Sequence, residues 1–96
     1  MVKIKIVGND IISAEGGTKL GYVSGNDVYD AGNRKLGFYE TNDVYGSSGQ
    51  KIGYLDSSGV KDARGVTVAP LSKVLESVKG SSNAMQAAMT YLLFLD

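Results

Sequence analysis

A short phrase that returns with a constant step of 16 residues constrains this chain more than any other feature. Lys19-Leu20-Gly21-Tyr22 is followed by Lys35-Leu36-Gly37-Phe38 and then by Lys51-Ile52-Gly53-Tyr54. Self-similarity at a fixed period is the signature of a repeat architecture, in which each unit builds the same supersecondary element. The chain is therefore predicted to use one small structural unit several times in a row.

Two further positions keep the same step. One holds only aliphatic residues: Ile12, Val28, Val44 and Val60. The other holds only glycine or asparagine: Gly17, Asn33, Gly49 and Gly65. Glycine and asparagine tolerate positive φ, so this second position predicts a left-handed turn residue in every unit. The first unit, from Lys3, is less regular, although Ile4 and Ile6 keep its apolar alternation.

Each unit reads as two short strands joined by two turns. Residues 19–22 alternate as a strand does, residues 24–27 are turn formers, and Val28-Tyr29 begins a second strand. We expect three stacked rows to form a shared core: Leu20/Leu36/Ile52, Tyr22/Phe38/Tyr54 and Val28/Val44/Val60. Gly21, Gly37 and Gly53 would lie on the opposite face, mark a bulge or bend, and be covered by Tyr29 and Tyr45. A bend at one fixed place per unit would curve the sheet toward closure.

After Thr67 the 16-residue pattern stops and helical periodicity begins. Leu71, Val74, Leu75 and Val78 follow Pro70 at helical spacing, and Gly80 would end this helix. Asn83 is a candidate N-cap, with Gln86 three residues later. The second helix, residues 84–95, is apolar nearly all round and must be buried, either against its own sheet or against another subunit. Its large side chains are the candidate interaction residues: Met85, Met89, Tyr91, Leu92, Leu93, Phe94 and Leu95.

These patterns predict a mostly β fold with two C-terminal α-helices. Four tandem hairpins, about eight strands, would be curved or closed around a pseudo-symmetry axis. The hairpin region spans residues 1–67. The helical tail spans residues 68–96, and it would pack with the repeats as one domain or serve oligomerisation.

Composition narrows the possible functions. The chain has 96 residues with 10 basic and 10 acidic side chains, so no basic footprint for nucleic acid is present. It has no cysteine and no histidine, which removes disulfides, thiolate zinc sites and catalysis by these residues. No segment reaches the length of a membrane span, and the N-terminus lacks the apolar region of a signal peptide. We therefore expect a cytoplasmic protein without membrane partners. No catalytic constellation or cofactor motif is present, and an enzyme is not expected.

Three sets of repeated residues are candidates for ligand binding. The aromatic residues Tyr22, Tyr29, Phe38, Tyr45 and Tyr54 would suit a sugar or a quaternary amine, although they also suit the interior of the sheet. Lys19, Lys35 and Lys51 would hold an anion if they form a row, or would be a solvated row offset by aspartates. The repeated Asn-Asp pairs at residues 9–10, 26–27 and 42–43 provide oxygen ligands for calcium, but ordinary turn chemistry explains them better.

The stretch from Gly21 to Phe38, with Asn26-Asp27-Val28-Tyr29 at its centre, resembles the repeats of small bacterial β-flower proteins. The resemblance covers residues 19–66 well and residues 3–18 weakly. It implies hairpin petals around a pseudo-symmetric axis and carries no known activity, cofactor or site.

The sequence therefore favours a non-enzymatic scaffold or protein-interaction module, a homo-oligomer that self-associates through its apolar C-terminal helix. The alternative is a domain that binds a small ligand, namely a sugar, quaternary amine or anion, through the repeat aromatics or lysines.

Overall fold

A computed structural model describes residues 2–95, which form one ten-stranded sheet and a short helical layer. The strand order is β10-β1-β2-β3-β4-β5-β6-β7-β8-β9, a meander in which neighbours along the chain pair in an antiparallel manner. The strands of the first four hairpins are β1 (Ile4–Val7), β2 (Asp10–Ser13), β3 (Lys19–Ser24), β4 (Asp27–Asp30), β5 (Lys35–Glu40), β6 (Asp43–Gly46), β7 (Lys51–Asp56) and β8 (Gly59–Asp62). The predicted mostly β hairpin-repeat fold with two C-terminal helices is thus confirmed.

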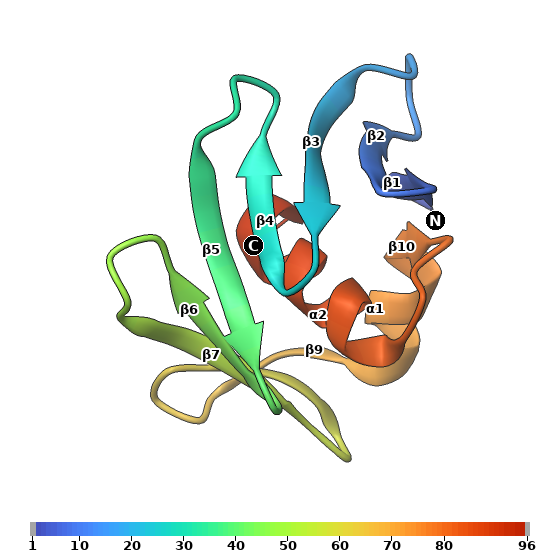
Figure 1. Ribbon diagram of the computed structural model, residues 1–96. Coiled ribbons are helices and arrows are strands. Elements are labelled where there is room, and N and C mark those ends of the chain that lie inside the picture. Colours follow the sequence, from blue (N-terminus) through green and yellow to red (C-terminus); the bar gives the residue numbers. More distant parts are fainter. Residues whose placement is uncertain (1, 96) are drawn as a thin grey trace.

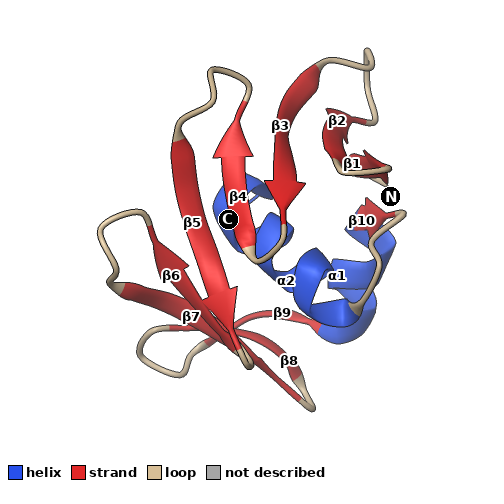
Figure 2. Ribbon diagram, viewed as in Figure 1, coloured by secondary structure: helices blue, strands red, loops and turns tan. Residues whose placement is uncertain are grey.

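The remaining elements are β9 (Thr67–Pro70), α1 (Leu71–Ser77), β10 (Val78–Lys79), α2 (Ala84–Thr90) and the π-helical turn η1 (Tyr91–Leu95). The sheet curves round the helices, so that α2 lies on its concave side and the hairpin turns point outward (Figure 1). Figure 2 shows the same division, with α2 on the concave side of the sheet and α1 at the opening between β9 and β10. Among the described residues, the end strands β9 and β10 do not pair with each other, and the sheet is curved without being closed.

The inner face of the sheet is built from small and β-branched residues. Val28, Val44 and Val60 are fully buried at 0 % exposure, which confirms the predicted valine row. The strand glycines lie on the same face and lie against the C-terminal helix. A Cβ at Gly37 would lie 3.3 Å from Leu93, and one at Gly53 would lie 2.8 Å from Leu92. Glycine therefore allows the helix to approach the sheet closely.

A β-bulge lies beside each of the repeated glycines Gly21, Gly37 and Gly53, as the glycine pattern predicts. Between β4 and β5 the register passes from Val28–Gly37 to Tyr29–Lys35, which leaves Leu36 as the extra residue. The same shift makes Leu20, Ile52 and Val68 the extra residues in the other long strands. Bulges bend a strand and increase its twist, and four of them at equivalent places curve this sheet.

The prediction that the aromatic row fills the core is wrong, and the bulge explains why. A strict alternation would place Leu20 and Tyr22 on one face, but the extra residue moves them apart. Leu20, Leu36 and Ile52 pack against the core, whereas Tyr22 alternates with the buried Gly21 and Val23 and points to the outer face. Tyr29 and Tyr45 are stacked on outer-face rings. Leu92 and Leu93, not these tyrosines, cover Gly53 and Gly37.

The first hairpin follows the others with a step of 17 residues instead of 16. Ile11, not Ile12, takes the place of Val28, because Ile11 pairs with Gly21 as Val28 pairs with Gly37. The extra residue lies in the loop between β2 and β3. The buried side chains of β1 are Ile4 and Ile6, as their alternation predicts.

The repeat also continues beyond the boundary read from the sequence. Val68 occupies the bulge position, and Ala69 pairs with Val60 where glycine stands in earlier units. β9 is thus the first strand of a fifth unit, α1 replaces its turn, and β10 pairs in a parallel manner with β1. The first helix is shorter than predicted, since Val78 belongs to β10 and is buried there.

The predicted turn and cap residues are confirmed. Gly17, Asn33, Gly49 and Gly65 all have positive φ, between 68° and 89°. The Asn83 side chain accepts a hydrogen bond from the Gln86 amide at 2.8 Å, which begins α2. Gln86 completes this cap, because its Oε1 accepts a hydrogen bond from the Ser82 amide.

Candidate functional site

The outer face of the sheet carries chemically similar rows that cross four strands each. In the central row, Asp27 is the partner of Phe38, which is the partner of Tyr45, which is the partner of Lys51. A second row runs from Asp10 through Tyr22 and Tyr29 to Lys35. A third runs from Asp43 through Tyr54 and Lys61 to Thr67. The repeat therefore brings together the predicted aromatic and lysine residues.

Aromatic stacking joins neighbouring strands within a row, and cation–π contacts join a lysine to a ring on the same strand. Tyr22 stacks on Tyr29 with ring centroids 5.0 Å apart, and Phe38 stacks on Tyr45 at 5.1 Å. The ammonium groups of Lys19, Lys35 and Lys51 lie over the rings of Tyr22, Phe38 and Tyr54, at 5.3, 4.8 and 4.7 Å from the centroids. A cation over a ring face is attracted by the quadrupole of the ring.

The same three lysines each form an ion pair. Lys19 lies 3.2 Å from Asp10, and Lys35 and Lys51 lie 3.1 Å from Asp27 and Asp43. The lysines therefore form a row of neutralised pairs and not a free cationic stripe. Because each ring already holds a neighbouring ring or a lysine, a sugar or quaternary amine would have to displace a contact that the chain makes with itself. This arrangement favours a structural role for the outer rows.

The repeated Asn-Asp turns use their groups within the fold. The Asn9, Asn26 and Asn42 carbonyl oxygens accept backbone hydrogen bonds from Val23, Tyr39 and Leu55, respectively. Their aspartates are the partners of the three lysines. In residues 2–95, no group of three or more side chains suited to a metal ion comes together.

The candidate interaction residues at the C-terminus divide into two groups. Met85, Met89, Tyr91 and Leu92 are buried within the chain itself. Leu93, Phe94 and Leu95 are only partly buried, although they pack against the same core. Within the described part of the chain, no helix has the length and apolar character needed to cross a membrane.

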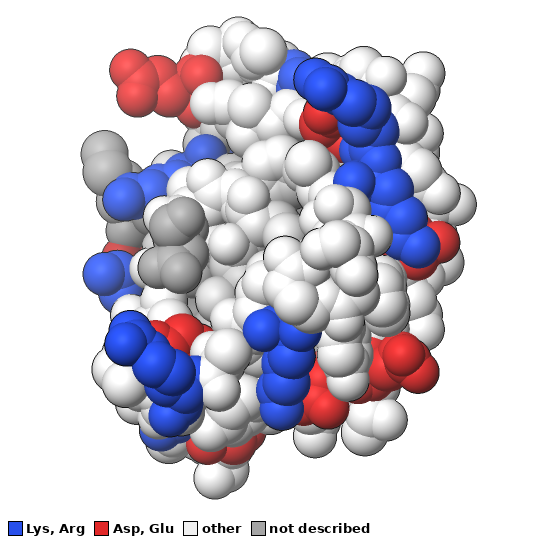
Figure 3. Space-filling model, turned by 90° about the vertical axis from the view of Figure 1, so that its left-hand side faces the viewer, with Lys and Arg blue, Asp and Glu red and all other residues white. Residues whose placement is uncertain are grey.

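Figure 3 shows one side of the molecule, on which charged side chains surround an area of uncharged residues. Both basic and acidic groups lie around that area. The six Lys and Arg side chains between residues 19 and 64 all form ion pairs: Lys19, Arg34, Lys35, Lys51, Lys61 and Arg64.

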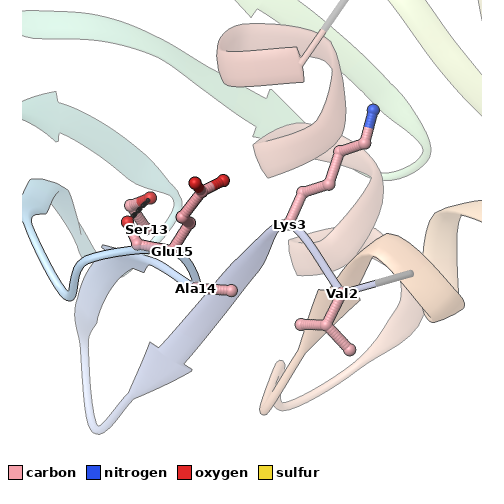
Figure 4. A pocket seen from close by; sticks show the side chains of 5 residues that line it. All are labelled: Val2, Lys3, Ser13, Ala14 and Glu15. Carbon is pink, nitrogen blue, oxygen red and sulfur yellow. Dashed lines mark hydrogen bonds between the residues drawn. The ribbon is translucent and has the colours of Figure 1, made fainter.

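Sequence analysis did not predict a hollow beside the first hairpin. Val2, Lys3, Ser13, Ala14 and Glu15 line it, and its volume is about 640 Å³. In Figure 4 the Lys3 side chain extends beside the C-terminal helix, and the Glu15 carboxylate rises from the loop that follows β2. The signal in the sequence is the loop after β2, which is one residue longer than its counterparts.

A curved meander of hairpins around a central helix defines the class of protein: a β-flower architecture. The family model described as "5-fold beta-flower protein" matches residues 2–95, and the chain belongs to this family. The five-fold description fits the four hairpins together with the unit formed by β9 and β10. No curated protein and no solved structure matches the chain.

Proposed function

We propose that this protein is a non-enzymatic scaffold that self-associates through the end of its C-terminal helix. The observation that carries the proposal is the change in burial along that helix. Residues 85–92 are buried by their own sheet, but Leu93, Phe94 and Leu95 keep part of their surface exposed. Three consecutive large apolar side chains that remain partly exposed favour contact with another apolar surface.

A second copy of the chain is the occupant that the composition favours. The formal net charge is 0, so two copies approach without net electrostatic repulsion. The bulge residues Leu36 and Ile52 are also partly buried beside the glycines that η1 covers. Their exposed parts would extend the apolar surface offered by the helix end.

The ligand-binding alternative receives less support from the contacts of its residues. Tyr22, Phe38 and Tyr54 already hold lysines over their rings. A quaternary amine would replace one cation by another, so its net gain would be small.

Light scattering coupled to size-exclusion chromatography tests the proposal over a range of protein concentrations. A contact made by a few side chains buries less than a standard interface, so we expect weak association with a Kd of roughly 0.1–1 mM. The double variant Phe94→Ser, Leu95→Ser should remain folded and shift toward the monomer.

Val66→Ser is the matched control, because Val66 is an exposed apolar residue in a loop outside the helix. It should leave the association unchanged. A wild-type chain that stays monomeric up to about 1 mM, or a double variant that associates as the wild type does, would contradict the proposal.

A further inference from the structure

Two side chains of opposite charge line the hollow beside the first hairpin. Lys3 and Glu15 both line it, and in residues 2–95 neither forms an ion pair. By contrast, Lys19, Lys35 and Lys51 on the outer face of the sheet each lie 3.1–3.2 Å from a carboxylate. Opposite charges that face one hollow without contacting each other can both be satisfied by a ligand between them.

The backbone on both sides of the hollow is fixed by hydrogen bonds. The Lys3 carbonyl accepts a hydrogen bond from the Ala14 amide at 3.0 Å, and the Lys3 amide donates to Ser77 at 2.8 Å. The Ser13 hydroxyl donates to the Glu15 carbonyl at 2.8 Å, which the dashed line in Figure 4 marks. The backbones of Lys3 and Ala14 are therefore joined at this corner of the sheet, and the exposed side chains of Lys3 and Glu15 can adjust to a ligand.

We propose that this hollow binds a small zwitterion of the amino-acid type. The ligand carboxylate would lie on the Lys3 ammonium group, and the ligand ammonium group would lie on the Glu15 carboxylate. Ala14, which lines the same hollow, offers an apolar contact to an aliphatic side chain. The volume of about 640 Å³ falls within the range of small-molecule sites, roughly 300–1,000 Å³.

A ligand with a single charge fits this site less well. An anion would gain the attraction of Lys3 but meet the repulsion of Glu15, and a cation would meet the reverse. Only a molecule that carries both signs satisfies both groups, so the specificity of the site follows from its charge pattern.

Thermal denaturation and amide chemical shifts in L-leucine test this proposal. Two one-charge analogues serve as comparison: 4-methylpentanoate, which lacks the ammonium group, and 3-methylbutylamine, which lacks the carboxylate. L-leucine at ten times its Kd should stabilise the fold by about 1.4 kcal/mol and raise Tm by about 6–11 °C. It should also shift the amide signals of Lys3 and of residues 13–15. Each analogue should bind at least roughly tenfold more weakly, because one charge of the site stays unsatisfied.

The variants Lys3→Gln and Glu15→Gln should each weaken L-leucine binding by about tenfold without loss of the fold. Lys5→Gln is the matched control, since Lys5 lies two residues along the same segment and does not line the hollow. The proposal is overturned if L-leucine, glycine and alanyl-alanine produce neither a Tm shift nor a localised amide shift at about 50 mM. Equal binding by the analogues, or binding that survives both variants, would overturn it as well.

Discussion

The two faces of this sheet are stabilised by different means. The inner face packs on the chain's own helix, and it consists of valine and glycine fitted to Leu92 and Leu93. The outer face has no second layer among residues 2–95, and rows of aspartate, aromatic and lysine side chains cover it. Close packing against the helix limits which side chains the inner face can hold. The outer face is stabilised by many small polar and aromatic contacts. We therefore expect changes on the inner face to cost more stability than changes on the outer face.

The largest effect is expected from Gly53→Ala on the inner face. A Cβ at this position would overlap the carbonyl oxygen of Lys61 and lie 2.8 Å from Leu92, so the strand or the helix would have to move. Overpacking of this kind costs about 1–3 kcal/mol, and we expect the upper end of that range in urea denaturation. Gly32→Ala is the control, because its Cβ would meet only the Asp30 side chain at 3.4 Å. Equal stability of the two variants would mean that the helix does not press on the sheet.

Val44 and Tyr45 allow the two faces to be compared at neighbouring positions of β6. Val44 is fully buried on the inner side, and Tyr45 stacks on Phe38 on the outer side. Val44→Ala should cost about 2 kcal/mol, since it removes buried methyl groups and leaves a cavity. Tyr45→Leu should cost about 1 kcal/mol, the typical contribution of an aromatic pair. Chemical denaturation of both variants measures the difference. A larger loss of unfolding free energy for Tyr45→Leu would contradict the expectation that inner-face changes cost more stability.

The hairpin turns lie outside both faces of the sheet. The effect of a turn substitution on the unfolding free energy should therefore add to the effect of a substitution on either face. Thr41 has φ of 55°, a left-handed conformation that is costly for a β-branched residue. The equivalent residue in the preceding hairpin is Gly25, with φ of 61°. Thr41→Gly should therefore raise the unfolding free energy by up to about 1 kcal/mol. Asn33→Gly, at a position where asparagine already tolerates φ of 68°, should change it less. A loss of stability in Thr41→Gly would show that its side chain contributes more than its backbone strain costs.

The smallest effect is expected from acid, and it should act on the turns beside the outer face. The backbone amide of Val66, followed by the amide and charge of Arg64, lowers the pKa of Asp62. Hydrogen bonds from the Ser58 hydroxyl and amide, with a further contribution from Lys61, lower the pKa of Asp56. A group whose pKa is lowered on folding stabilises the fold above its unfolded pKa, and this stability is lost as pH falls through the folded pKa.

Tm should thus be flat near neutral pH and fall below about pH 4, where these carboxylates take up protons. Asp62→Asn should flatten that fall, because it removes one of the groups. Scanning calorimetry from about pH 2 to pH 6 measures both curves. An equally steep fall in the variant would assign the acid sensitivity to other carboxylates.

Much of the local structure could be predicted from single residues. The repeat of Gly17, Asn33, Gly49 and Gly65 indicated left-handed turns, and Asn83 with Gln86 indicated the start of α2. The register of the first hairpin was also present in the sequence, because Asn9-Asp10 and Asn26-Asp27 are 17 residues apart. The fifth unit was harder to predict, since Val68 and Ala69 match the pattern only in size and polarity.

The hollow beside Lys3 could not be predicted from the order of residues. Its lining comes from the N-terminal segment and from a loop about ten residues later, and only the pairing of β1 with β2 places them together. Similarly, residue type alone does not tell Lys3, which forms no ion pair within the described part of the chain, from Lys19, which does.

The sequence by itself determined the repeating hairpin, the places of its turns and bulges, and the need to bury residues 84–95. These are local properties: glycine and asparagine permit positive φ, and an apolar helix avoids water. The tertiary structure alone decided which face of each strand is covered. One extra residue per bulge moves the aromatic side chains to the outside, and the glycines then face the helix. A pairing register depends on where the partner strand lies, and the alternation within one strand does not contain that information.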